Sequence, residues 1–127
     1  MAQLEHINIT VSDARKTAAL LSDLFGWHIR WEGPVMNGRG YSVHVGSDES
    51  YLAVYAPEGQ TEPADTATLR RPGALNHLGV VVSDLDQVEA RVQAHGFTPH
   101  MHADYAPGRR FYFDGPDGLE IEVVSYA

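Results

Sequence analysis

The sequence predicts an α+β fold in which two βαβββ modules pair into an open, barrel-like sheet. Three observations predict it: a ten-residue segment that occurs twice, a helical pattern after each copy, and three strand-like runs after each helical pattern. LEHINITVSD at residues 4–13 returns as LNHLGVVVSD at residues 75–84, with five of ten positions identical at an offset of 71. Self-similarity of this kind indicates a duplicated structural unit.

The first module covers residues 1–56. After its first strand, Ser12 or Asp13 can cap a helix that ends before Gly26, where a left-handed residue is favoured. The apolar stripe of this helix is formed by Ala18, Leu21 and Phe25. Three β-like runs follow, separated by turns that contain glycine, at residues 27–32, 41–46 and 51–56.

The second module covers residues 74–127 and repeats this order. Ser83 or Asp84 can cap its helix, and Gly96 follows the helical pattern. The apolar stripe is formed by Leu85, Val88 and Val92, and the three runs that follow lie at residues 97–102, 109–114 and 119–125. Residues 57–73 are rich in Pro, Thr, Glu and Gly and have no apolar period, which predicts a surface linker or a lid.

Composition limits the function classes. A length of 127 residues suits a single domain at 1–127, and the absence of cysteine excludes disulfides and thiolate metal sites. The net charge of −8 makes nucleic acid and an anionic membrane surface poor partners. Because the first residues show no basic region followed by an apolar stretch, we expect a cytoplasmic location and no secretory signal.

Strand alternation selects the candidate metal ligands. In each first strand the aliphatic residues face the helix, so His6 and His77 point the opposite way. Glu122 lies on the corresponding side of the last strand, where burial of a carboxylate without a partner is costly. A strand histidine is more often hydrogen-bonded than metal-bound, but two at equivalent repeat positions, with a mid-strand glutamate, favour a metal site.

The two repeat segments, together with RFYFDGPDGLEIEVV at residues 110–124, resemble the vicinal-oxygen-chelate superfamily of glyoxalases, bleomycin-resistance proteins and extradiol dioxygenases. The resemblance covers the whole chain and implies the glyoxalase/dioxygenase fold. Its most specific part is the aromatic pair, the Pro-Asp-Gly turn and Glu122, four residues beyond the glycine. Gly115 departs from the family's usual aspartate, although the spacing to the glutamate is kept.

The resemblance implies that His6, His77 and Glu122 hold one divalent ion, which is Fe, Mn, Ni, Co or Zn. Glyoxalase I usually adds a glutamate or glutamine on the last strand of the first module. Ala53 is the expected equivalent here, which puts a typical glyoxalase I mechanism in doubt. Three protein ligands leave positions for two vicinal oxygens of a small substrate.

The expected catalytic residues are Tyr112, His44 and His102, with His100 also on the predicted inner face. Arg110 and Tyr55 are the expected substrate-binding residues. The resemblance favours an enzyme, either a dioxygenase (an oxidoreductase) or a lyase or isomerase of glyoxalase type. The alternatives are a fosfomycin-type thiol transferase and a bleomycin-resistance-type ligand-binding protein. It also implies a homodimer, and leaves open whether each site is built from one chain or two.

Overall fold

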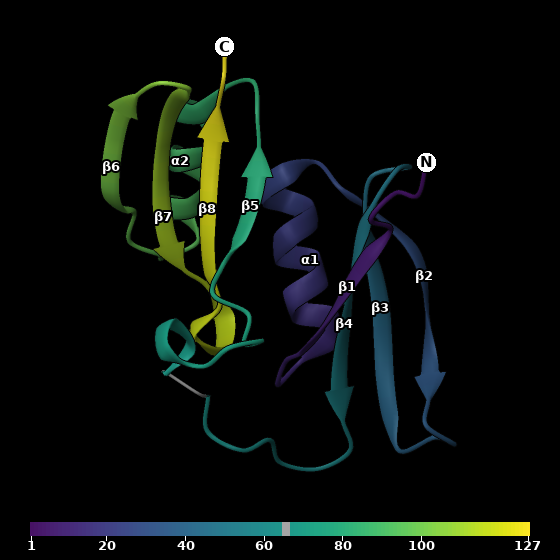
Figure 1. Ribbon diagram of the computed structural model, residues 1–127. Coiled ribbons are helices and arrows are strands. Elements are labelled where there is room, and N and C mark those ends of the chain that lie inside the picture. The colour runs from purple at the N-terminus through teal and green to yellow at the C-terminus, as the bar shows by residue number, and fades with distance from the viewer. Residues whose placement is uncertain (65–66) are drawn as a thin grey trace. The chain divides into compact units, whose positions relative to one another are not determined.

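The computed structural model describes residues 1–64 and 67–127, which form two compact units, Met1–Glu62 and Pro63–Ala127. Within the described residues, each unit consists of one four-stranded sheet and one α-helix in the order strand, helix, three strands (Figure 1). The predicted α+β class and the two βαβββ modules are therefore confirmed. Each unit's sheet is open, with two edge strands.

The N-terminal unit contains β1 (His6–Thr10), α1 (Ala14–Phe25), β2 (His28–Val35), β3 (Gly40–Gly46) and β4 (Tyr51–Pro57). Its strand order is β1-β4-β3-β2, with β1 parallel to β4 and the other neighbours antiparallel. Helix α1 packs on one face of the sheet, and the core between them is fully buried. That core includes Leu21, Leu24, Val43, Val45 and Val54.

The C-terminal unit contains η1 (Thr68–Arg70), β5 (Leu78–Val81), α2 (Leu85–Ala94), β6 (His100–Tyr105), β7 (Gly108–Asp114), η2 (Pro116–Gly118) and β8 (Glu120–Ser125). Its strand order, β5-β8-β7-β6, repeats that of the first unit. Helix α2 lies behind this sheet in Figure 1. The buried core includes Val92, Phe111, Phe113, Ile121 and Val123.

The capping aspartates predicted from the sequence are present at the start of both helices. Asp13 accepts a hydrogen bond from the backbone N–H of Lys16 at 3.0 Å, and α1 ends at Gly26 with φ of 71°. Asp84 does the same for the N–H of Gln87 at 3.0 Å. Capping aspartates of this kind satisfy N–H groups that have no partner inside the helix.

The strand predicted at residues 97–102 begins later, at His100. Phe97 instead donates its backbone N–H to the Val92 carbonyl at 3.2 Å. The residues after α2 are therefore still bonded to the helix end, and pairing with β7 begins only at His100. The predicted linker 57–73 contains the end of β4 at Pro57 and the short helix η1.

Among the described residues, no helix is long and apolar enough to cross a membrane.

Candidate functional site

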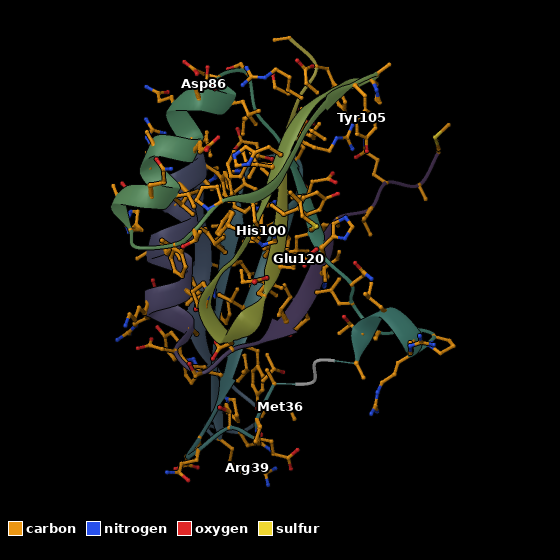
Figure 2. The ribbon with its side chains drawn as sticks, turned by 90° about the vertical axis from the view of Figure 1, so that its left-hand side faces the viewer. Met36, Arg39, Asp86, His100, Tyr105 and Glu120 are labelled. Carbon is orange, nitrogen blue, oxygen red and sulfur yellow. The ribbon has the colours of Figure 1, made fainter. Side chains whose placement is uncertain are left out.

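The face of each sheet that points away from its helix, called here the non-helix face, holds most of the expected site residues. In the C-terminal unit Glu122 pairs with Gly79 on one side and with Tyr112 on the other. Figure 2 shows Tyr105 and Glu120 across the sheet from Asp86 of α2, on this same face. Residues directly paired across strands share a face, so this register gathers the expected residues of β7 and β8.

The register also makes the two units comparable. Ala53 pairs with Asn8 and with His44, as Glu122 pairs with Gly79 and Tyr112. Ala53 therefore occupies in the N-terminal unit the place that the glutamate has in the C-terminal unit. His44 is likewise the counterpart of Tyr112. The C-terminal unit therefore has a carboxylate beside this residue, and the N-terminal unit has an alanine.

Glu122 is held through one of its two carboxylate oxygens. The Tyr112 hydroxyl donates a hydrogen bond to Oε2, and Nη1 of Arg110 lies 3.7 Å from the same atom. The side chains of Arg110 and Glu122 are each only 14% exposed. The other oxygen, Oε1, lies toward β5, 3.9 Å from the place a Cβ would take at Gly79. One oxygen is thus anchored, and the other points toward the strand that follows His77.

The hydrogen bond to Glu122 raises the pKa of the Tyr112 phenol, with burial as the second cause. A phenol normally titrates near 10, so Tyr112 stays protonated at neutral pH and acts toward Glu122 as a hydrogen-bond donor. This state suits Tyr112 to orienting the carboxylate.

Both repeated histidines bond to the residue that precedes them. Nδ1 of His6 lies 2.8 Å from Oε1 of Glu5, and Nδ1 of His77 lies 2.8 Å from Oδ1 of Asn76. Since both partners offer an acceptor oxygen, we assign the proton to Nδ1 in each neutral ring. Each imidazole then presents Nε2 with its lone pair, which is the form that binds a metal.

The N-terminal unit carries a row of aromatic rings on its non-helix face, here called the ring row, with one ring from each strand. Ring centroids are separated by 4.9 Å from His6 to Tyr51, 4.6 Å from Tyr51 to His44, and 5.1 Å from His44 to Trp31. Burial lowers the pKa of His44, with the neighbouring His6 as a second cause. A neutral His44 at pH 7 is able to accept a proton.

Arg110 is more constrained than the sequence predicted. Its guanidinium carbon lies 4.9 Å from the centre of the Tyr105 ring, and Nη2 donates to the Gly108 carbonyl at 3.4 Å. With Glu122 beside it, the charge is already partly compensated. Nε of Arg110 is buried and has no hydrogen-bond partner among the described residues.

The placement of His102 by strand alternation is wrong. The register between β6 and β7 shifts between His100 and Ala103, where Met101 takes a φ of 51°. This irregularity turns His102 to the helix side, where Nε2 lies 2.9 Å from Oε2 of Glu89 on α2. His102 therefore lies on the helix side of its sheet, away from the Glu122 cluster.

Two other expected residues do lie on the non-helix faces. His100 pairs with Tyr112, with Nε2 at 3.7 Å from Oδ2 of Asp114. The ring of Tyr55 lies over Gly40, since a Cβ built there would come within 2.5 Å of the Tyr55 ring.

The donor set fits a divalent ion chemically, because two neutral imidazoles and one carboxylate are standard ligands for the first-row metals. Within each unit, the described residues hold no group of three His, Asp or Glu side chains that could by itself bind a metal. The expected ligands are divided between the units, with His6 in the first and His77 and Glu122 in the second.

Sequence reasoning missed the partners of the expected residues. Glu5, Asn76 and Trp31 were not singled out, although Glu5 and Asn76 occupy matching repeat positions before the two histidines. That match was a usable signal. The Tyr105 contact with Arg110 spans a hairpin and left no signal of this kind.

The N-terminal unit also contains an open cavity of about 430 Å³, lined by Asp13, Arg15, Tyr41 and Glu58 among others. It lies beyond the last residue of β1, whereas His6 is the first residue of that strand. The cavity is thus separate from the ring row.

Solved structures with the same fold include several of known type. A glyoxalase/bleomycin resistance protein/dioxygenase domain from Frankia sp. EAN1pec is 19% identical, with a TM-score of 0.81 and 98% of each chain covered. The trypanothione-dependent glyoxalase I of Leishmania major is 18% identical, with a TM-score of 0.78, over 99% of this chain and 88% of that one. A variant of the fosfomycin resistance protein FosX from Listeria monocytogenes, in complex with Mn(II) and 1S,2S-dihydroxypropylphosphonic acid, is 18% identical, with a TM-score of 0.72, over 98% and 92%.

No curated protein sequence matches the chain significantly. The sequence does match the family described as the Glyoxalase/Bleomycin resistance protein/Dioxygenase superfamily over residues 3–123. That match covers nearly the whole length of both βαβββ modules. This chain therefore belongs to the Glyoxalase/Bleomycin resistance protein/Dioxygenase superfamily.

Proposed function

We propose that this chain is a divalent-metal-dependent enzyme that acts on a small substrate bound through two vicinal oxygens. His6, His77 and Glu122 are the proposed ligands. The observation that carries the proposal is the state of Glu122, whose Oε2 is anchored by Tyr112 while Oε1 faces the strand next to His77. A carboxylate that is 14% exposed on a sheet face needs such partners, and a metal ion would complete them.

The two histidines support the same proposal. In each, the hydrogen bond at Nδ1 selects the tautomer that binds through Nε2 and limits rotation of the ring. Such outer partners typically change metal affinity by about 10- to 100-fold. The partner of His6 is a carboxylate, Glu5, whereas the partner of His77 is an amide, Asn76.

When bound, the ion would act as a Lewis acid that stabilises negative charge developing on the substrate oxygens. We propose His44 as the group that accepts the substrate proton. Its lowered pKa keeps it neutral, and Ala53 beside it supplies no carboxylate to occupy it. Tyr112, which stays protonated, is proposed to hold Glu122 in place.

The number of protein ligands narrows the reaction classes that we propose. Ala53 leaves the proposed site with three protein ligands, where a typical glyoxalase I usually has four. This favours either dioxygen chemistry on an oxygen-rich substrate or a lyase or isomerase that uses a histidine base. We propose a homodimer as the working assembly, which sedimentation velocity would test.

Enzyme loaded separately with Fe(II), Mn(II), Ni(II), Co(II) or Zn(II) would be tested against catechols with an oxygen electrode and against hemithioacetals by absorbance. Turnover that is lost in Glu122→Ala and strongly reduced in His44→Gln would support the proposal. Thiol-dependent consumption of fosfomycin would replace it with the transferase alternative. Tight binding of bleomycin by protein that takes up no metal would replace it with ligand sequestration.

A further inference from the structure

Arg110 of β7 is a nearly buried cation whose hydrogen-bonding groups are poorly satisfied. Its side chain is only 14% exposed. Nη2 donates to the Gly108 carbonyl at 3.4 Å, Nη1 lies 3.7 Å from Oε2 of Glu122, and Nε has no hydrogen-bond partner among the described residues. A guanidinium that stabilises a fold normally makes two parallel bonds to a carboxylate at about 2.7–2.9 Å. Because burial of a cation with such long contacts is costly, fold stability does not explain why Arg110 lies here.

The Tyr105 ring holds the guanidinium in place without neutralising it. The guanidinium carbon lies 4.9 Å from the centre of that ring. An aromatic face attracts a cation through its quadrupole but carries no charge of its own. The ion-pair partner of Arg110 among the described residues is Glu122, at a distance longer than a hydrogen bond. The positive charge therefore lies beside a proposed metal ligand and is only partly compensated.

This charge would act on any ion that Glu122 holds. Carboxylate oxygens bind first-row divalent ions at about 2.0–2.2 Å, so the ion would lie within about 8 Å of Nη1, whatever the position of the N-terminal unit. Two cations at such a distance repel each other where little water screens them, whereas an anion bound to the ion is attracted. The imidazoles are neutral and the charges of Glu122 and Arg110 cancel. The site therefore keeps the full charge of the ion for its substrate.

We propose that Arg110 is a positioning residue that acts through Glu122 and the ion, weakening the binding of the metal and strengthening the binding of an anionic substrate to it. The substrate class is then one that binds as an anion, an ionised diol or a hydroxy acid, in preference to a neutral carbonyl compound or diol. This inference rests on the proposed function, because it takes Glu122 to be a metal ligand.

A purely structural role for Arg110 predicts a different pattern. If Arg110 only held Glu122 in place, its removal would weaken the binding of metal and of anion together. The proposed role predicts changes of opposite sign, with tighter metal and weaker anion. Disorder of the site cannot produce that combination.

The first part of the test measures metal affinity. Arg110→Met keeps an apolar side chain that packs on the Tyr105 ring and removes the charge, and Arg110→Lys restores the charge. Competition with a chromogenic chelator gives the Kd for Co(II). We expect Arg110→Met to tighten Co(II) binding by at least about tenfold, with Arg110→Lys within about threefold of wild type.

Arg109→Met is the matched control. Arg109 is the preceding residue of β7, but it pairs with Asp86 of α2 at 3.0 Å on the helix side of the sheet. The same loss of charge there should leave the Co(II) Kd within about twofold of wild type, because water screens an exposed charge. Circular dichroism and Tm establish that each variant folds, and Arg110→Gln replaces Arg110→Met if the latter does not.

The second part measures the charge that the loaded site presents. Azide is an anion and imidazole is used in its neutral form, and each changes the visible absorption of Co(II) when it binds to the ion. In Arg110→Met the Kd of azide should rise by about tenfold, while that of imidazole should change by less than about twofold. Arg110→Lys should return the Kd of azide toward the wild-type value.

The two proposals fail in different ways. Absence of Co(II) binding in wild type and in every Arg110 variant overturns the proposed function and this inference with it. Co(II) binding that is unchanged or weaker in Arg110→Met overturns the inference alone, and so does an azide Kd that does not rise. Equal tightening of Co(II) in Arg109→Met would overturn it as well, because net charge would then explain the effect.

Discussion

Replacement of Tyr112 by phenylalanine removes one hydroxyl group and keeps the ring. The ring's edge contact with His77, at 5.6 Å between centroids, should therefore survive. What is lost is the hydrogen bond to Oε2 of Glu122. The carboxylate can then turn toward Arg110, whose Nη1 is 3.7 Å away, and an ion pair there competes with metal binding.

The size of the effect follows from the charge and burial of the acceptor. A hydrogen bond to a charged group contributes about 1.5–3 kcal/mol, and Glu122, at 14% exposure, is only weakly screened by water. At 1.4 kcal/mol for each factor of ten, the metal Kd should rise by about 10- to 100-fold. The same range is found for other residues that orient metal ligands.

Competition with a chromogenic chelator would measure the Kd for Zn(II) and Mn(II) in wild type and Tyr112→Phe. Tyr41→Phe is the matched control, since the Tyr41 hydroxyl also donates to a carboxylate, Oε1 of Glu32, at 2.7 Å. It should leave the Kd unchanged. A Kd for Tyr112→Phe within about twofold of wild type, or an equal loss in the control, would refute the role given to Tyr112.

Three further predictions test the register, the electrostatics and the backbone. Ala53→Glu places a carboxylate beside His44 as Glu122 lies beside Tyr112, and should tighten metal binding by about tenfold in the same competition assay; weaker binding would contradict the equivalence. His44 should titrate below pH 6.5 by NMR. Its contribution to the free energy of unfolding is therefore present above pH 6.5 and is lost as the pH falls through its lowered pKa. Urea unfolding should find this pH dependence in wild type and not in His44→Gln. Gly46→Ala drives a Cβ into the Ser50 carbonyl and should cost about 1–3 kcal/mol by thermal unfolding, and an unchanged Tm would refute this packing.

The parts of the site that follow from strand alternation were predictable. Because side chains alternate with a period of two, the repeated segments placed His6 and His77 away from the helices, and the last strand placed Glu122 likewise. The repeat also allowed Ala53 to be matched to Glu122 before any register was known. These residues needed only local patterns and one internal comparison.

The parts that depend on irregular backbone were not predictable. The left-handed conformation of Met101 shifts β6 and turns His102 toward Glu89, thirteen residues earlier in the chain. A β-bulge changes the face of every residue beyond it, and an ordinary methionine gives no warning of one. The close approach of the Trp31 indole to Gly33 likewise lies next to a register shift, between Ile29 and Trp31.

Metal content tests the central proposal most directly. Protein purified without a histidine tag would be loaded anaerobically with Fe, Mn, Ni, Co or Zn and then assayed by elemental analysis, for wild type, His6→Ala, His77→Ala and Glu122→Ala. Near-stoichiometric metal in wild type, lost in all three variants, is the predicted result. Absence of metal in wild type under every loading, or retention of full content in the variants, would contradict it.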